Sequence, residues 1–374
     1  MTISTEGTAG GNHPEVQAAA EAAVLAINKA GGLKGHQVKD IFCNDQFTSQ
    51  GAAACAREAV SDHVLAVAGS FSVYDDNINP ILQQAGIPNV GNTPVQTTDF
   101  NSPISFPIQS GAIDDYQGDI FAMAQSSVSK IGVALLDLPT VTAVAATLHA
   151  AFAAAKTPSG GKVQDVGSVS IPVTASEFTP YAAALKKDGA TGILAVLAPQ
   201  QVEGLAKAMV SIGYKATLAG AANDYDFSDT QILGKSGEAV LGTASEPPPS
   251  GSAPGAVEFR ADMAAASKAG VPGASLLSYS ALEAWTGVEA LATVVDGMTT
   301  PVNTPDLLAA LKHVTGANVD GLLPEPWQTE SSSRPAATAR IAENYEYVNY
   351  LQPNGDWQLS SPKTLNLPAL LSGS

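Results

Sequence analysis

The chain has 374 residues, of which 45% are hydrophobic, and a formal net charge of −17 at pH 7. This length is enough for two domains with a core each. The negative charge argues against a nucleic-acid partner, because phosphate groups would repel it, and no apolar run is long enough to span a membrane. The histidines and cysteines lack H-x-x-x-H and C-x-x-C spacing, so no metal site is predicted.

The first hundred residues predict alternating helices and strands. Helices are expected at 14–32 and 50–62, and a strand at 64–72. The strand-like runs end in loops of small polar residues at 43–45, 69–72 and 91–93. In an open parallel sheet, ligands bind outside the carboxyl ends of the strands. These loops are therefore candidate ligand-binding segments.

The two cysteines lie twelve residues apart. Cys43 ends a predicted strand and Cys55 lies in the helix that follows. This helix must fold back beside the strand, so the two thiols can meet within bridging distance. We favour a disulfide, because secreted proteins keep such pairs. The alternative is two small buried thiols in a reduced protein.

Beyond residue 100 the same alternation predicts a second parallel α/β unit. Strands are expected at 130–136, 162–171, 192–197 and 216–219, and helices at about 140–155, 177–187 and 200–212. Two of these strands are continuously apolar, as expected when helices cover both faces of a sheet. After a proline-rich break at 247–252, helices are expected at 257–268, 278–296 and 304–313, and a hairpin at 345–359.

Sequence motifs for catalysis are not found. Ser70 follows a strand but lacks the G-x-S-x-G pattern of a nucleophile elbow. The pairs Asp75-Asp76 and Asp114-Asp115 are adjacent in sequence, so their carboxylates tend to diverge and are not expected to act as an acid/base pair. The sequence therefore does not support an enzyme, and it predicts neither a cofactor nor a bound metal.

The order of these features resembles the extracytoplasmic solute-binding proteins of ABC importers, of the Leu/Ile/Val-binding type with the type I periplasmic-binding fold. The resemblance covers nearly the whole chain. It rests on the segments 26–35 (AINKAGGLKG), 44–46, 67–72, 85–93 and 278–284. The chain departs from the family pattern at Leu138-Pro139-Thr140, where the family often has Tyr-Gly.

The resemblance implies an α/β fold of two lobes, each a parallel sheet flanked by helices. Three hinge crossings are expected near 111–114, 243–249 and 325–340. Lobe 1 would hold residues 1–112 and 248–325, and lobe 2 residues 113–247 and 326–374. The ligand would bind in the cleft between the lobes, which would close on it.

In lobe 1, the resemblance points to the loops that follow two strands. The hydroxyls of Ser70 and Ser72 would hold a ligand carboxylate, or they would cap the helix that starts near Tyr74. Phe71 and Tyr74 would stack on the ligand. Two further candidates follow the next strand, where they would contact the ligand or only shape a turn: Asn92 and Thr93.

In lobe 2, the candidates are Tyr116, Gln200, Asn223 and Asp224. Tyr116 would donate a hydrogen bond to the ligand, or it would be a half-exposed residue at a helix start. Gln200 would face the cleft, while Gln201 would only begin its helix. Asn223 and Asp224 would meet an ammonium or hydroxyl group, although Asp224 is equally consistent with an exposed loop acid.

The implied function is a receptor that captures a small polar molecule, above all an amino acid or small carboxylate, and delivers it to ABC permease subunits. The alternative is a sensing domain of the same fold that feeds a regulatory partner. The expected form is a monomer in the periplasm or on the cell surface, without its signal peptide. It would be tethered to the membrane through an N-terminal segment that has been removed from this sequence.

Overall fold

The computed structural model describes residues 1–8, 11–225, 240–317, 319, 321–329, 334–361 and 363–373. The chain divides into two compact units: unit 1 is Met1–Ser110 with Pro249–Glu343, and unit 2 is Gly111–Pro248 with Asn344–Ser374. The chain therefore passes from one unit to the other three times.

The third crossing lies after Glu343, whereas the sequence placed lobe 2 from residue 326 onward. Described residues before this crossing pack within unit 1. The indole of Trp327, which is 2% exposed, donates a hydrogen bond to the carbonyl of Pro107 at 3.0 Å. Arg340 donates to the carbonyl of Ser105 at 2.7 Å. These contacts hold the segment on unit 1; residues 330–333 of the predicted hinge lie outside the described part.

The described residues of unit 1 form five short strands, and the strand pairs among them are all parallel. They are β1 (Thr2–Ser4), β2 (Phe42–Asn44), β3 (Val67–Ala68), β4 (Asn89–Val90) and β5 (Ser105–Phe106). β1 pairs with β2, and β3, β4 and β5 lie side by side in that order. A parallel bridge between Ser4 and Phe71 places the end of β1 beside the loop after β3.

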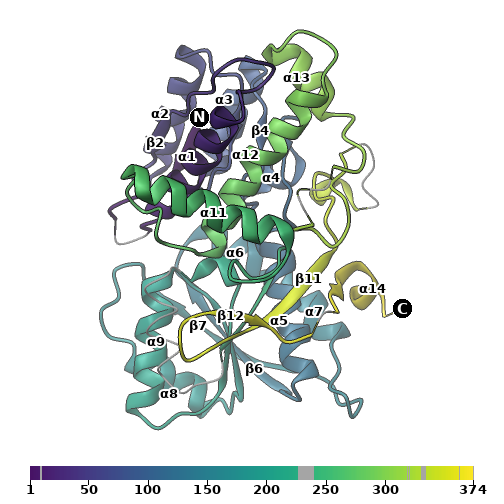
Figure 1. The fold of residues 1–374 in the computed structure, drawn as a ribbon. Coiled ribbons are helices and arrows are strands. Elements are labelled where there is room, and N and C mark those ends of the chain that lie inside the picture. Colours follow the sequence, from purple (N-terminus) through teal and green to yellow (C-terminus); the bar gives the residue numbers. More distant parts are fainter. Residues whose placement is uncertain are drawn as a thin grey trace. The chain divides into compact units, whose positions relative to one another are not determined.

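The helices of unit 1 surround these strands (Figure 1). They are α1 (Pro14–Lys29), α2 (Ser49–Ser61), α3 (Asp75–Ala85), α4 (Thr97–Asn101), α11 (Pro254–Ala269), α12 (Tyr279–Gly297) and α13 (Thr304–Leu311), with a short 3-10 turn, η2 (Ala336–Thr338). α1 is rich in alanine and packs along α12. Small side chains allow the two helices to approach closely, and they form much of the core of unit 1.

Unit 2 is built on one sheet with the strand order β12-β11-β10-β9-β8-β6-β7. The strands are β6 (Lys130–Leu136), β7 (Gln164–Ile171), β8 (Gly192–Val196), β9 (Thr217–Ala219), β10 (Val240–Ala244), β11 (Tyr345–Leu351), β12 (Trp357–Leu359) and β13 (Leu365–Asn366). β6 to β10 pair in parallel, while β11 is antiparallel to β10, β12 and β13. The predicted hairpin at 345–359 is confirmed.

The helices of unit 2 follow its strands in alternation. They are α5 (Ala112–Gln125), α6 (Pro139–Ala145), α7 (Leu148–Ala154), α8 (Thr179–Lys187), α9 (Pro199–Ser211), the 3-10 turn η1 (Ala222–Asp224) and α14 (Leu367–Ser372). The single helix expected at 140–155 is two helices, because several β-branched residues weaken helix formation there. At the break, the hydroxyl of Thr147 donates to the carbonyl of Val144 at 2.7 Å.

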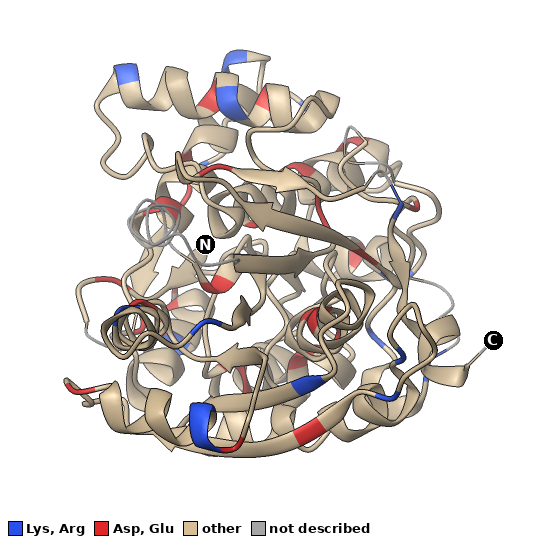
Figure 2. Ribbon diagram, turned by 90° about the horizontal axis from the view of Figure 1, so that it is seen from below, with Lys and Arg blue, Asp and Glu red and all other residues tan. Residues whose placement is uncertain are grey.

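Acidic residues outnumber basic ones in the sequence by 35 to 18. Figure 2 marks where both kinds fall along the ribbon. Several carboxyl groups lie in the interior, including Asp45, Asp75, Asp99 and Asp119, all of which are completely buried. None of the described helices combines the length and the apolar character that a membrane crossing would need.

Candidate functional site

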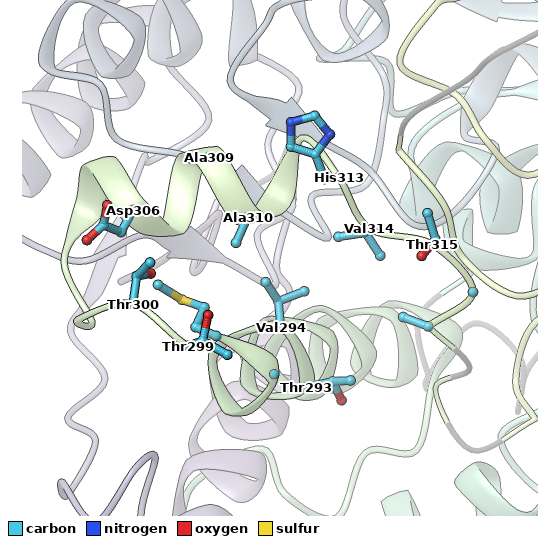
Figure 3. A pocket seen from close by; sticks show the side chains of 14 residues that line it. Thr293, Val294, Thr299, Thr300, Asp306, Ala309, Ala310, His313, Val314 and Thr315 are labelled. Atoms are coloured by element: carbon cyan, nitrogen blue, oxygen red, sulfur yellow. The ribbon is translucent and has the colours of Figure 1, made fainter.

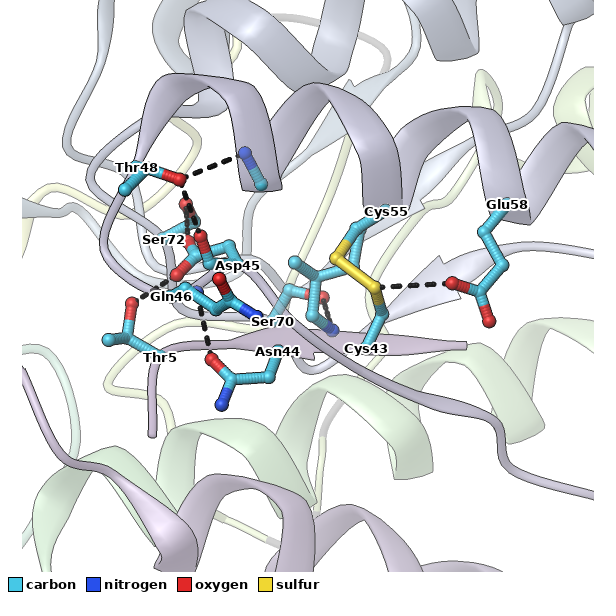
Figure 4. Close-up of a disulfide and its surroundings, with 12 residues drawn as sticks. Thr5, Cys43, Asn44, Asp45, Gln46, Thr48, Cys55, Glu58, Ser70 and Ser72 are labelled. Atoms are coloured by element: carbon cyan, nitrogen blue, oxygen red, sulfur yellow. Dashed lines mark hydrogen bonds between the residues drawn. A yellow bond between two sulfur atoms is a disulfide. The ribbon is translucent and has the colours of Figure 1, made fainter. Parts of the chain in front are cut away.

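Asp45 connects three of the loops at the strand ends of unit 1 (Figure 4). It directly follows β2 and is completely buried. Its Oδ1 atom accepts hydrogen bonds from the hydroxyl of Thr5, which follows β1, and from the backbone N–H of Phe47. Its Oδ2 atom accepts from the hydroxyl of Ser72, after β3, at 2.5 Å. The sequence indicated the 43–45 loop but did not single out Asp45.

Ser70 and Ser72 have different roles within this arrangement. The Oγ of Ser70 accepts a hydrogen bond from the backbone N–H of Ile3 at 3.0 Å and so fixes β1 beside the loop. The Oγ of Ser72 accepts from the N–H of Tyr74 at 3.2 Å. Helix α3 begins one residue later, and its N-cap residue makes no side-chain capping bond. Ser72 therefore binds the N-cap residue of α3, in the way that the capping alternative expected, whereas Ser70 holds β1; a contact of either hydroxyl with a ligand stays a prediction.

Two aromatic side chains of the same loop are half-buried: Phe71 and Tyr74. The ring of Phe71 makes an edge contact with His13, with ring centroids 4.8 Å apart. Tyr74 makes a similar contact with Phe47 at 5.7 Å. Burial, with the nearby charge of Asp45, raises the pKa of the Tyr74 hydroxyl, so this group stays protonated and can donate a hydrogen bond.

The loop after β4 is also held by carboxylates. Thr93 donates its hydroxyl proton to Oε2 of Glu283, on α12, at 2.7 Å, and its backbone N–H donates to the carbonyl of Ser70 at 3.0 Å. Asn92 donates from Nδ2 to Oδ1 of Asp99 at 2.8 Å. Two loops that the sequence selected therefore lie together in unit 1.

Asp99 fixes the shape of the second loop from the first turn of α4. It accepts hydrogen bonds from the backbone N–H groups of Val95 at 3.1 Å and Gln96 at 2.8 Å. The side chains of Asn79 and Asn92 donate to the same carboxyl group. Burial raises the pKa of Asp99 to about 7, although these hydrogen bonds act in the opposite direction.

Sequence reasoning missed Glu283 because its partner is 190 residues away. Glu283 lies within the Ser278–Ala284 segment that carried the family resemblance, which was the available signal. It also missed Glu15, near the start of α1, whose Oε1 atom accepts from the hydroxyl of Ser278 at 3.3 Å. The N-termini of α1 and α12 are thereby joined.

In unit 2, the structure brings together two of the predicted residues, Tyr116 and Asp224. Tyr116 lies in the second turn of α5 and donates its hydroxyl proton to Oδ2 of Asp224, in η1, at 2.5 Å. Burial, and then the negative charge of Asp224, raise the pKa of Tyr116 well above its usual value. Asn223 is buried in the same turn, a few residues after β9.

Asp119 is a further carboxyl group of α5 that the sequence did not indicate. Its Oδ1 atom accepts from the backbone N–H of Thr243, in β10, at 3.0 Å. The ladder between β9 and β10 ends at the Ala219–Leu241 pair, so this N–H group lies beyond it. Burial raises the pKa of Asp119 well above its usual value, as does the charge of Asp224.

Gln200 does not join these residues. It is exposed at the second position of α9, and its side chain makes no hydrogen bond with the described part of the protein. The neighbouring Gln201 is 2% exposed and donates from Nε2 to the carbonyl of Val173 at 2.9 Å. Within unit 2, therefore, Gln201 rather than Gln200 has a fixed polar contact.

Residues 1–344 match the family model described as periplasmic binding protein. The chain belongs to the periplasmic binding protein family. This membership confirms the resemblance seen in the sequence, and the α/β fold with a mainly parallel sheet agrees with the type I fold of that family. No curated protein is significantly similar to the chain in sequence.

Solved structures of similar fold cover nearly the whole chain. A possible leucine/isoleucine/valine-binding protein from Rhodopirellula baltica is 16% identical with a TM-score of 0.80, over 96% of this chain and 95% of that one. A solute-binding protein from R. palustris, in complex with 4-hydroxybenzoate, is 19% identical with a TM-score of 0.75, over 98% and 97%. A fatty acid ABC transporter substrate-binding protein from Thermomonospora curvata is 16% identical with a TM-score of 0.79, over 100% and 93%.

The disulfide lies in unit 1, close to the same polar loops. Cys43, in β2, is joined to Cys55, in α2, with the Cα atoms 5.6 Å apart (Figure 4). The turn that contains Asp45 lies between them in sequence. The bridge therefore closes the segment that presents this carboxylate to Thr5 and Ser72.

A cavity of about 520 Å³ lies between α12 and α13 in unit 1 (Figure 3). Thr293, Thr299, Thr300 and His313 are among its lining residues, and none of the predicted site residues is. Among the described residues, no group of three His, Cys, Asp or Glu side chains is arranged to hold a metal ion.

Proposed function

We propose that this periplasmic binding protein is the receptor of an ABC importer, which captures a small polar solute in a cleft between its two units and delivers it to permease subunits. The observation that carries this proposal is the gathering of polar side chains at the strand ends within each unit. In unit 1 these are the loops after β3 and β4, and in unit 2 they are the start of α5 and the turn after β9. Ligands of open parallel sheets bind at such ends.

The residues assigned to the solute are the ones that the sequence selected and that carry fixed polar or aromatic groups. In unit 1 they are Ser70, Phe71, Ser72, Tyr74, Asn92 and Thr93, and in unit 2 Tyr116, Asn223 and Asp224. Gln200 would join them only from an exposed position on α9. An amino acid or a small carboxylate is the solute class that these groups suggest, and no catalytic role is assigned to them.

The disulfide supports an extracytoplasmic location for this receptor. Bridges such as Cys43–Cys55 persist in oxidising compartments and are rare in the reducing cytosol. The family description, periplasmic binding protein, agrees with this location.

The test is a thermal-shift screen of the purified protein against amino acids, small acids, amides and sugars, followed by calorimetry on each hit. A solute that binds only the folded state stabilises it by about 2.7 kcal/mol at a hundred times its Kd. We expect one chemical class to raise the melting temperature and to be recovered unchanged. A compound recovered in altered form would contradict the proposal.

Thr93→Val and Tyr116→Phe should each weaken the binding of the solute found, because each removes one hydroxyl with little change of shape. Gln200→Ala is the matched control, since its side chain is exposed and makes no hydrogen bond with the described residues. If all three variants bind as well as the original protein, the assignment of the site is wrong.

A further inference from the structure

Three of the five hydroxyl groups assigned to the solute share one property: each donates its proton to a carboxylate of its own unit. Ser72 donates to Asp45, and Thr93 donates to Glu283. In unit 2, Tyr116 donates to Asp224. A hydroxyl has a single proton and two lone pairs. Once that proton is committed to a carboxylate, what remains for a solute is an acceptor.

Asn92 shows the same arrangement with an amide. Its Nδ2 atom donates to Asp99, which accepts four such bonds, and this fixes which end of the amide is nitrogen. Its Oδ1 atom is buried and has no hydrogen-bond partner. A buried carbonyl oxygen without a partner costs free energy until a donor reaches it. The amide therefore also offers an acceptor.

The charges around these groups also favour a solute that donates hydrogen bonds. The carboxyl groups of Asp45 and Asp99 take their hydrogen bonds from hydroxyls, amides and backbone N–H groups, and these neutral donors bring no positive charge to either loop of unit 1. Hydrogen bonds between a charged donor and an acceptor are about twice as strong as neutral ones. A cationic head group would satisfy the open acceptors and be attracted by the carboxylates behind them. A carboxylate would meet lone pairs at these groups and could accept hydrogen bonds from the hydroxyls of Ser70 and Tyr74.

We infer that the solute is recognised through a hydrogen-bond-donating head group, an ammonium or amidinium, and that a bare carboxylate binds more weakly. This inference rests on the proposed function, because it takes the same residues as the site. It narrows the solute class from amino acids and small carboxylates to compounds that carry a cationic amine or amidine. It also separates this protein from the R. palustris relative, whose structure holds 4-hydroxybenzoate.

Three planar probes test the inference: benzamidine, benzamide and benzoate share a ring and differ only in the head group. A second series provides aliphatic analogues: 3-methylbutylamine, 3-methylbutanamide and 3-methylbutanoate. Leucine is included as an amino acid. We expect the cation of at least one series to bind and its matched amide to bind more weakly. The matched acid should have a Kd at least about tenfold higher than that of the cation, because one unpaired buried polar group usually costs this much.

Two variants connect this preference to the hydroxyl–carboxylate pairs. Glu283→Gln replaces a carboxylate, which only accepts hydrogen bonds, by an amide that can also donate to Thr93. The Thr93 hydroxyl could then donate its proton to a solute, so the ratio of cation affinity to acid affinity should fall several-fold. Tyr116→Phe, in unit 2, should weaken the cation without improving the acid, and it serves if the first variant does not fold. Glu177→Gln, at an exposed position, makes the same chemical change as the first variant and should leave the ratio unchanged.

The outcomes separate the two proposals. If an acid binds more tightly than its matched amine or amidine, the inference is overturned while the receptor proposal stands. Binding of leucine alone, with neither cation bound, also overturns the inference. If none of the seven probes, nor any compound of the wider screen, stabilises the protein, the receptor proposal fails and the inference fails with it.

Discussion

Buried carboxylates organise the loops at the strand ends of unit 1. Asp45 binds hydroxyls from two other loops, and Asp99 binds the backbone of the loop after β4. Each carboxyl group is completely buried, so removing it leaves several buried donors without partners. The cost of a buried polar group that loses its partner is about 1–3 kcal/mol.

We therefore expect Asp45→Ala to lower the free energy of unfolding by about 2–4 kcal/mol, since Thr5 and Ser72 both lose their acceptor. Urea unfolding followed by circular dichroism measures this change. Asp62→Ala is the control, because Asp62 is exposed just after α2. Equal effects of the two substitutions would contradict the role given to Asp45.

The burial of Asp75 should make the stability of the protein fall as the pH rises. Both of its carboxyl oxygens are buried without a hydrogen-bond partner. Burial raises the pKa of Asp75 well above its usual value, and so do the charges of Asp99, Asp45 and Asp76. A carboxyl group whose folded-state pKa is raised binds its proton more tightly in the folded chain. Its stabilising contribution is complete below the unfolded pKa, near 3.9, and is lost as the pH rises through the folded pKa.

Asp75→Asn should accordingly stabilise the protein by about 1–3 kcal/mol at pH 8 and by less at pH 5. Asp99, whose pKa is about 7, adds to the loss of stability of the original protein between pH 4 and pH 7. Urea unfolding of both proteins at pH 5, 6, 7 and 8 gives the free energy of unfolding as a function of pH, and the slopes of the two curves are compared. If the two curves are parallel over this range, Asp75 is not the titrating group.

Only part of the candidate site was predictable at the level of residues. The loops after β3 and β4 were indicated because small polar residues follow apolar strand runs. Glu283 and Asp99 were not indicated, because a buried acid has no local pattern and its partners are distant in sequence or in an irregular loop. Gln200 and Gln201 are adjacent, and only the start of α9 decides which of them is buried.

At the level of elements, the backbone of α12 lies very close to the loops that follow two strands of unit 1. Gly69 and Gly91, directly after β3 and β4, lie against its backbone. A Cβ atom on Gly287 of α12 would come within 2.9 Å of backbone atoms of both. Backbone atoms cannot move aside as a side chain can, so this contact requires glycine.

Gly287→Ala should therefore lower the free energy of unfolding by about 1–3 kcal/mol, the usual cost of overpacking. Gly297→Ala is a matched control in the same helix, because a Cβ atom there meets nothing within 4 Å. This control should be neutral or stabilising by up to about 1 kcal/mol, since alanine favours helix. Thermal and urea unfolding of both variants measure the difference, and a Gly287→Ala protein as stable as the original would contradict the contact.

The sequence predicted most elements, because their apolar patterns are local. β6 matches its expected bounds, and α12 differs by one residue at each end. The sequence did not predict the division of 140–155 into α6 and α7. The many alanines in this segment favour helix, and the prediction gave too little weight to the β-branched residues among these alanines. The third crossing was placed too early because the packing of Trp327 on Pro107 joins distant segments.

At the scale of the whole molecule, the net charge of −17 opposes compaction. Salt screens such repulsion over a Debye length of about 10 Å at 0.1 M. We expect the melting temperature to rise by a few degrees between about 10 mM and 300 mM sodium chloride and then to level off. Sucrose of matched osmolality is the control, and a melting temperature that does not change with salt would show that the repulsion is negligible.

If the proposed site is right, the bridge between Cys43 and Cys55 would make solute recognition depend on whether the chain has been oxidised. The Asp45 turn lies between the two half-cystines, so reduction releases the segment that holds Thr5 and Ser72. A chain that has not met an oxidant would fold with this turn less constrained, and it would discriminate poorly among head groups. Selectivity would then be acquired during oxidative maturation, so that the newly made protein would differ from the mature one in what it binds rather than in how it is folded.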